Sequence, residues 1–194
     1  MPKISVIVPV FQHAKFISEC LNSLLAQSLE DWEAIIIDDG SDDGSGQICN
    51  KFAQRDSRIK YYFQENKGIL KLSENFNRAL ELSSGEFIAV LEGDDYWPKN
   101  KLENQIRGFS DTNVGVVWGD GEILIDGKIS PLRGYTGNFQ ESTLQNDPLG
   151  IGLKALIFSH YFNMPTISVM YRREILDSIG GFYQPARCSW KKHQ

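Results

Sequence analysis

Short apolar runs alternate with amphipathic stretches along the N-terminal half of the chain. Four runs are dense in apolar residues, which is typical of strands covered on both faces, and they span residues 4–10, 32–37, 58–63 and 86–91. Between them, apolar positions recur at helical spacing over residues 14–27, about 46–54, 72–82 and 98–109. The alternation predicts an α/β fold with a doubly wound, mostly parallel sheet flanked by helices.

The second half of the chain has a weaker pattern. Its expected elements are strands at 114–118 and 166–171, a hairpin at 122–129, and helices at 149–160 and 172–179. Residues 130–150 combine Pro, Gly, Asn and Ser with little periodicity, which indicates a long loop. Pro98 is expected at the first position of its helix, where the missing N–H costs nothing.

Composition narrows the classes of function. The 194 residues carry a net charge of −5, whereas a nucleic-acid binder needs a basic face, so no nucleic-acid partner is expected. The three cysteines are odd in number and far apart, which fits neither a zinc site nor a disulfide framework. No apolar run approaches the ~20 residues of a membrane span, and the first residues have the pattern of a strand and not of a signal peptide. A cytoplasmic location is therefore expected, with peripheral association at the inner face of the membrane left open.

Ligands of doubly wound sheets bind beyond the carboxyl ends of the strands, and two acidic clusters fall there. In the first cluster, Asp38 and Asp39 directly follow a strand and precede a Gly-rich turn. A carboxylate at this position can accept the N–H groups of a base or the hydroxyls of a ribose. The alternative is a turn with a helix cap, and it has more weight for Asp42 and Asp43.

The second cluster places Glu92, Asp94 and Asp95 within four residues after another strand. Three such carboxylates repel one another unless a cation is present. Oxygen ligands select hard divalent ions, so the expected cofactor is Mn²⁺ or Mg²⁺ completed by phosphate oxygens. A solvated acidic loop is the alternative. The sequence has no phosphate-binding P-loop, no zinc-protease motif and no nucleophile elbow.

Several segments, taken in this order and spacing, resemble glycosyltransferase family 2, which has the GT-A fold. They are Ile7-Val-Pro-Val-Phe11, the helix at 14–27, Ile37-Asp-Asp-Gly-Ser41, Asn66-Lys-Gly68 with Asn75 and Asn77, Ser84-Gly-Glu-Phe-Ile88, and Glu92-Gly-Asp-Asp-Tyr-Trp97. The resemblance covers about residues 3–183. Two departures stand out, because Gln12 replaces the family's Asn and Glu92 replaces the first Asp of its D-x-D region.

The resemblance implies a role for each matched residue. Phe11 would stack on the base, Asp39 would hydrogen-bond it, most often a uracil, and Asp94 would face the ribose or sugar. Asp95 would bind the metal that bridges the diphosphate. The implied nucleotide-binding set is Pro9, Phe11, Asp39, Lys67, Gly68 and Asp94. The segment from Met164 to Arg173, which ends in Tyr-Arg-Arg, would border the acceptor side.

The implied reaction is an inverting transfer of sugar from a nucleotide-diphosphate sugar, of which a UDP-sugar is the expected kind, to an acceptor hydroxyl. The acceptor would be a glycan or a lipid-linked sugar in bacterial-type surface polysaccharide or glycan biosynthesis. The family's base lies shortly after the segment that matches Gly180-Gly-Phe182, and residues 183–194 contain no Asp or Glu. We therefore expect a C-terminal part that is incomplete and stops before the catalytic base, with donor binding kept and transfer weak.

The expected organisation is one domain over residues 1–183, with a nucleotide-binding half at about 1–110, an acceptor-side half at 111–183 and an atypical tail at 184–194. Two alternatives stay open at this stage. A nucleotidyltransferase would normally carry a Gly-rich basic loop after the first strand, and Pro9-Val-Phe-Gln-His13 has none. A non-catalytic nucleotide-sugar-binding domain is compatible with the missing base.

Overall fold

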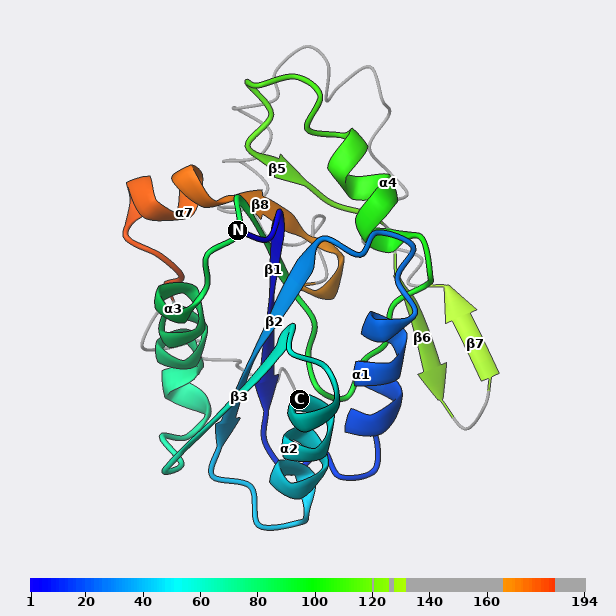
Figure 1. Cartoon of the computed structure of the whole chain (residues 1–194), viewed down its shortest axis with the longest axis vertical. Coiled ribbons are helices and arrows are strands. Elements are labelled where there is room, and N and C mark those ends of the chain that lie inside the picture. The colour runs from blue at the N-terminus through cyan, green and yellow to red at the C-terminus, as the bar shows by residue number, and fades with distance from the viewer. Residues whose placement is uncertain (120, 126–127, 132–165, 184–194) are drawn as a thin grey trace, which may run out of the picture. The chain divides into compact units, whose positions relative to one another are not determined.

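The structure is a computed structural model that describes residues 1–119, 121–125, 128–131 and 166–183 (Figure 1). The chain divides into two compact units. The first comprises Met1–Val117 with Met170–Gln194, and the second comprises Trp118–Val169. The expected halves at 1–110 and 111–183 stay a prediction.

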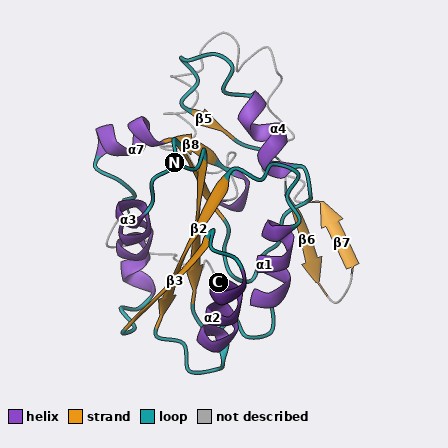
Figure 2. Ribbon diagram, viewed as in Figure 1, coloured by secondary structure: helices purple, strands orange, loops and turns teal. Residues whose placement is uncertain are grey.

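A mixed sheet with a parallel core forms the first unit (Figure 2). The strand order is β3-β2-β1-β4-β8-β5, and β1 to β4 run parallel while β8 runs antiparallel to β4 and β5. The strands are β1 Ile4–Val10, β2 Trp32–Asp39, β3 Ile59–Gln64, β4 Phe87–Val90, β5 Val116–Val117 and β8 Met170–Arg172. The predicted mixed α/β fold with a mostly parallel sheet is confirmed.

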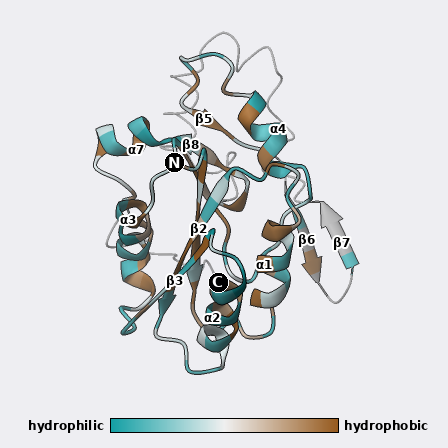
Figure 3. Ribbon diagram, viewed as in Figure 1, coloured by the Kyte–Doolittle hydropathy of each residue, from teal (hydrophilic) through white to brown (hydrophobic). Residues whose placement is uncertain are grey.

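Helices cover both faces of this sheet. They are α1 Ile17–Leu25, α2 Ser45–Arg55, α3 Leu72–Leu82 after the 3₁₀ turn η1 Ile69–Lys71, α4 Lys101–Arg107 and α7 Arg173–Ile179. Alternate residues of β1 separate the two cores: Val6 and Val8 pack in the cluster that contains Leu21 of α1, whereas Ile7 packs in the cluster that contains Phe76 of α3. The helices are accordingly mixed in hydropathy, and α1 and α2 lie opposite α3 across the strands (Figures 1 and 3).

Several predicted boundaries differ from the structure, among them the helix predicted at 14–27, which is α1 Ile17–Leu25, and two of the differences have a clear physical cause. Helix α4 begins at Lys101, and Pro98 lies before it. The side chain of Gln27 explains this start, because its Nε2 donates to the Pro98 carbonyl (2.9 Å) while its Oε1 accepts the N–H of Leu102 (3.1 Å). Residues 166–168 form the 3₁₀ turn η2 instead of a strand, and a Val169 N–H bond to the Thr166 carbonyl closes the turn.

The described part of the second unit contains the predicted hairpin. Strands β6 Glu122–Ile125 and β7 Lys128–Pro131 pair antiparallel, and the two residues of the predicted turn lie outside the described residues. The expected helix at 149–160, the atypical tail at 184–194 and all but two residues of the expected loop at 130–150 also lie outside them. Among the described helices, none combines the length and the apolar character that crossing a bilayer requires.

A buried carboxylate ties the amino ends of the strands together. Glu33 of β2 accepts hydrogen bonds from Ser5 Oγ (2.8 Å), from the Ser84 N–H (2.6 Å) and from Lys60 Nζ (2.7 Å). Burial opposes ionisation, but the donors Lys60, Ser84 and Ser5 outweigh it and lower the pKa of Glu33 from 4.5 to about 2. This side chain therefore links β1, β2, β3 and the turn before β4.

Because the folded pKa of Glu33 lies below its unfolded value, its contribution to stability is complete above pH 4.5 and is lost as the pH falls toward 2. The shift corresponds to about 3 kcal/mol. Urea unfolding of Glu33→Gln should show a lower stability than wild type at pH 7 and a weaker loss between pH 4.5 and 2. Glu19→Gln, on the exposed face of α1, is the control, and an equal acid dependence in both variants would contradict the assignment.

Candidate functional site

A cavity of about 300 Å³ lies at the carboxyl ends of β1, β2 and β4. Five of the six predicted nucleotide-binding residues line it, and they are Pro9, Phe11, Asp39, Gly68 and Asp94. Parallel pairing accounts for this convergence, because Pro9 lies opposite Ile37 and Ile7 lies opposite Val90, so the strand ends open onto one edge. The wall is mostly apolar, and Ile69 and Leu72 form part of it.

Asp39 is the last residue of β2 and is 6% exposed. Its Oδ1 accepts hydrogen bonds from Gln64 Nε2 (2.6 Å) and from the backbone N–H of Lys67 (3.1 Å). Its main-chain carbonyl accepts a bond from Asn66 Nδ2 (2.9 Å). The segment after β3 therefore holds this carboxylate in place at the cavity wall.

Lys67 contributes through its backbone. Its side chain is absent from the cavity lining, and its Nζ pairs with Glu74 at 3.2 Å. Glu74 also pairs with Lys71 at 3.1 Å. The lysine ammonium is thus engaged on the exposed surface of η1 and α3, while the N–H of the same residue positions Asp39.

The remaining acidic residues after β2 hold the loop that follows β1. Asp42 accepts a bond from Gln12 Nε2 (2.6 Å), and Asp43 accepts one from the Ala14 N–H (2.8 Å). Burial acts to raise the pKa of Asp43, but bonds from Ser45 and Ala14 outweigh it and lower the pKa. Asp42 and Asp43 therefore have the structural role that the turn-and-cap alternative predicts.

Asp38 is also satisfied internally. It is fully buried and accepts bonds from the Ser41 N–H (2.9 Å) and from Tyr61 Oη (2.8 Å). Ser41 Oγ in turn accepts the N–H of Gln12, whose φ of 59° is the one left-handed value among the described non-glycine residues. Of the four aspartates in this turn, only Asp39 reaches the cavity.

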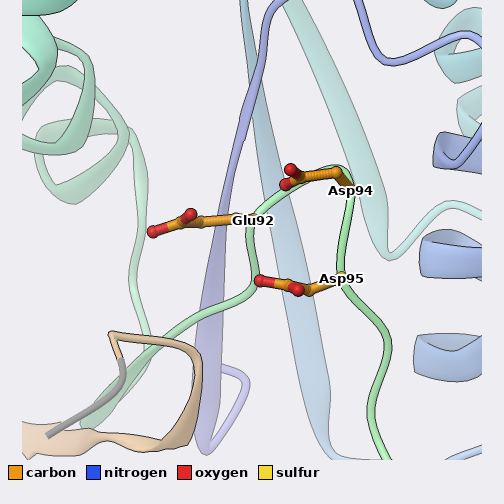
Figure 4. Close-up of side chains that lie close together, drawn as sticks. All are labelled: Glu92, Asp94 and Asp95. Atoms are coloured by element: carbon orange, nitrogen blue, oxygen red, sulfur yellow. The ribbon is translucent and has the colours of Figure 1, made fainter. Parts of the chain in front are cut away.

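The second acidic cluster is compact. Glu92, Asp94 and Asp95 each offer a carboxylate oxygen, and these oxygens lie within 4.8 Å of one another (Figure 4). Burial raises the pKa of Glu92, and the charges of Asp95 and Asp94 raise it further. Burial, followed by the charge of Asp94, raises the pKa of Asp95. Carboxylates that resist ionisation for these reasons fit a hard divalent cation, which would neutralise their repulsion.

Two hydrogen bonds, to β1 and to α1, fix the backbone of this acidic loop. The Gly93 N–H donates to the Pro9 carbonyl (3.1 Å), and the thiol of Cys20 donates to the Glu92 carbonyl (3.5 Å). Asp95 itself is not among the cavity-lining residues, but its carboxylate lies beside those of Glu92 and Asp94, which are. Asp39 and Asp95 therefore belong to adjoining parts of one rim.

His13 is a cavity residue that the sequence analysis missed. Its Nε2 lies 3.9 Å from Asp94 Oδ1, and its Nδ1 is buried without a hydrogen-bond partner among the described residues. A Cβ added at Gly93 would lie 2.5 Å from that Nδ1, so the imidazole occupies the space that glycine leaves free. In the sequence, the available signal was that His13 follows Gln12 in the turn after β1. Its contacts with Gly93 and Asp94 depend on the tertiary structure.

The two arginines of the Tyr-Arg-Arg segment support the fold at the opposite edge of the sheet. Arg172 donates to the Val114 and Phe109 carbonyls (3.0 Å each). Arg173 donates to the Gly85 carbonyl (2.7 Å) and to the Leu80 carbonyl near the end of α3 (3.3 Å). The arginine pair lies at the beginning of β4, because Arg172 pairs with Phe87, whereas the cavity lies beyond its end.

Comparison with known proteins agrees with this architecture. The model of Glycosyl transferase family 2 matches residues 5–180, and the chain belongs to this family. An uncharacterised glycosyltransferase of Nostoc sp., alr2836, is 32% identical over 181 residues, which are 91% of this chain and 53% of the relative. GlyG of Streptococcus pneumoniae is 34% identical over 117 residues, 60% of this chain and 38% of the relative. TuaG of Bacillus subtilis, a candidate teichuronic acid biosynthesis glycosyltransferase, is 37% identical over 131 residues, 63% of this chain and 51% of the relative.

Solved structures with the same fold include two enzymes with bound sugar nucleotides. TarS of S. aureus in complex with UDP-GlcNAc aligns with a TM-score of 0.70 and 25% identity, over 94% of this chain and 48% of that one. The mannosyltransferase PcManGT of Pyrobaculum calidifontis, in complex with GDP-Man and Mn²⁺, aligns with a TM-score of 0.65 and 21% identity, over 94% and 48%. The chain thus spans about half or less of the length of these relatives.

The fit of His13 against Gly93 can be tested by a double-mutant cycle. Gly93→Ala should destabilise the fold by about 1–3 kcal/mol in urea unfolding, because the added methyl meets the imidazole and the Pro9 carbonyl. His13→Ala in the same background should recover most of this loss, which gives a coupling energy between the two positions. Gly119→Ala is the control, since no described atom lies within 4 Å of its added Cβ. Strictly additive effects would contradict the packing.

Proposed function

We propose that this chain is the donor-binding part of a glycosyltransferase that moves a sugar, with inversion, from a UDP-sugar to an acceptor hydroxyl. The observation that carries the proposal is the cavity that joins Phe11 and Asp39 to an acidic cluster at one edge of the sheet. A flat apolar side chain, a desolvated carboxylate and a cation site match the base, the ring N–H groups and the diphosphate of such a donor. The UDP-GlcNAc complex of TarS supports the choice of donor class.

In this proposal the base enters between the protein's apolar walls. Phe11 is 46% exposed and lines the cavity together with Pro9, so its ring is available for stacking. Asp39 accepts the N–H of the base through its free oxygen. Gly68, at a φ of 81°, allows the chain to turn past the cavity without a side chain.

Asp95 is proposed as the metal ligand, with Glu92 and Asp94 close enough to share the ion, and Asp94 also faces the ribose or sugar. A bound Mn²⁺ or Mg²⁺ supplies Lewis-acid stabilisation of the nucleoside diphosphate that leaves. The backbone of the acidic loop bonds to the Pro9 carbonyl and to the Cys20 thiol. These bonds hold the three carboxylates close together, so that little reorganisation is needed when the donor binds.

The acceptor is proposed to be a glycan or a lipid-linked sugar in surface polysaccharide biosynthesis, which rests on the named role of TuaG. Its hydroxyl must lose a proton to a general base as the sugar is transferred. Within the ranges that the structure describes, we assign no residue as that base.

The donor and metal proposal is tested by calorimetry with UDP in the presence and absence of Mn²⁺. Wild type should bind UDP more tightly with Mn²⁺, and Asp95→Asn should lose most of this gain, about tenfold or more in Kd. Asp177→Asn makes the same change on the exposed face of α7 and should bind as wild type does. Metal-independent binding in wild type would refute the metal assignment. Binding without transfer to any acceptor would favour a nucleotide-sugar-binding domain.

The stacking role is tested with two phenylalanines of similar exposure. Phe11→Ala should weaken UDP binding by about tenfold, because base stacking on an aromatic ring contributes roughly 1–3 kcal/mol. Phe16 is 49% exposed and does not line the cavity, so Phe16→Ala should leave the Kd unchanged. Equal effects of the two substitutions would show that Phe11 has no contact with the base.

A further inference from the structure

Behind the cavity, a buried amide network connects β3 to α3. Gln64, the last residue of β3, lies opposite Asp39 in the parallel register. Its Nε2 donates to Asp39 Oδ1 and to Asn75 Oδ1, both at 2.6 Å, and its Oε1 accepts a bond from Arg78 at 2.5 Å. Because an arginine can only donate, Arg78 fixes which end of the Gln64 amide faces Asp39.

This network leaves Asp39 with one free oxygen. Its Oδ1 receives two donors, from Gln64 and from the Lys67 backbone, and a carboxylate oxygen has about two acceptor positions. For Oδ2, no donor is found among the described residues. A ligand in the cavity therefore meets a single acceptor and not a bidentate carboxylate.

The same network orients Asn75. This side chain is 2% exposed and lines the cavity, and its Oδ1 is occupied by Gln64. Its Nδ2 has no partner within the described part of the chain, so the group left to a ligand is a donor. The cavity wall thus presents one acceptor, from Asp39, and one donor, from Asn75.

One acceptor beside one donor matches the edge of uracil, whose ring N–H stands between two carbonyls. Guanine presents its ring N–H next to an amino group and needs two acceptor oxygens, of which Asp39 has one free. Cytosine has no ring N–H and would set a lone pair against the carboxylate. We propose that Gln64 and Asn75 are specificity-determining residues that make the cavity select uracil, which rests on the proposed function because it requires a nucleoside diphosphate in this cavity.

The test is base selectivity, measured as Kd by calorimetry for UDP, CDP and GDP with Mn²⁺. Wild type should bind UDP at least about tenfold more tightly than either of the others, since one mismatched hydrogen bond costs about that much. In Asn75→Asp the bond from Gln64 is kept while the donor becomes an acceptor. Relative to uracil, cytosine has an amino group on one side of the ring nitrogen and guanine has one on the other. At least one of the ratios Kd(CDP)/Kd(UDP) and Kd(GDP)/Kd(UDP) should therefore fall about tenfold.

A second variant tests Gln64 separately. Gln64→Leu frees an acceptor position on Asp39 Oδ1, so the GDP-to-UDP ratio should fall about tenfold. Asn50→Asp, an exposed position on α2 outside the cavity, controls for the added charge and should leave every ratio unchanged. Ratios of Kd do not depend on the folded fraction, so a partly unfolded variant still gives a valid result.

The outcomes separate the two proposals. If wild type binds none of the three nucleotides, the proposed function fails. If wild type binds them equally, or if Asn75→Asp and Gln64→Leu both keep the wild-type ratios, the assignment of these two residues is overturned while the donor site itself stands.

Discussion

Carboxylates gathered at the carboxyl edge of a parallel sheet repel one another, and the supply of hydrogen-bond donors to them organises this protein. Asp42 and Asp43 accept hydrogen bonds from the loop after β1 and hold it in place, and Asp38 accepts hydrogen bonds from Ser41 in its own turn and from Tyr61 of β3. For Asp39, one carboxylate oxygen accepts two hydrogen bonds and the other accepts none from the described residues. Burial, followed by repulsion from the neighbouring carboxylates, instead raises the pKa values of Glu92 and Asp95. Binding capacity therefore lies where the fold leaves carboxylates without donors.

The two edges of the sheet show a division of roles. At the amino edge, Glu33, Arg172 and Arg173 bond to the backbone or to buried side chains and connect distant strands. At the carboxyl edge, the loops leave a cavity with an apolar wall. Some of its polar groups keep hydrogen-bond donors or acceptors without a partner among the described residues.

Specificity in such a cavity depends on which groups remain unpaired after folding. Gln64 does not line the cavity, yet its hydrogen bonds to Asp39 and Asn75 set which oxygen of Asp39 and which end of the Asn75 amide are left unpaired. A buried polar network of this kind is effective because each member fixes the orientation of the next, and because an unmatched donor or acceptor in a desolvated site is costly.

The sequence by itself determined the four parallel strands of the N-terminal half and the helical faces that cover them, because apolar periodicity is local and reports burial directly. Strand-end geometry placed the two acidic clusters at one edge, and the family resemblance implied the set Pro9, Phe11, Asp39, Gly68 and Asp94, all of which line the cavity. Only the tertiary structure decided the partners: Gln64 is 25 residues from Asp39, and His13 meets Gly93 from another strand end. Tertiary contacts also decided that the Lys67 side chain pairs with Glu74 outside the cavity and that α4 begins at Lys101. Hydrogen bonding between residues so far apart depends on strand register and loop path, which no local pattern encodes.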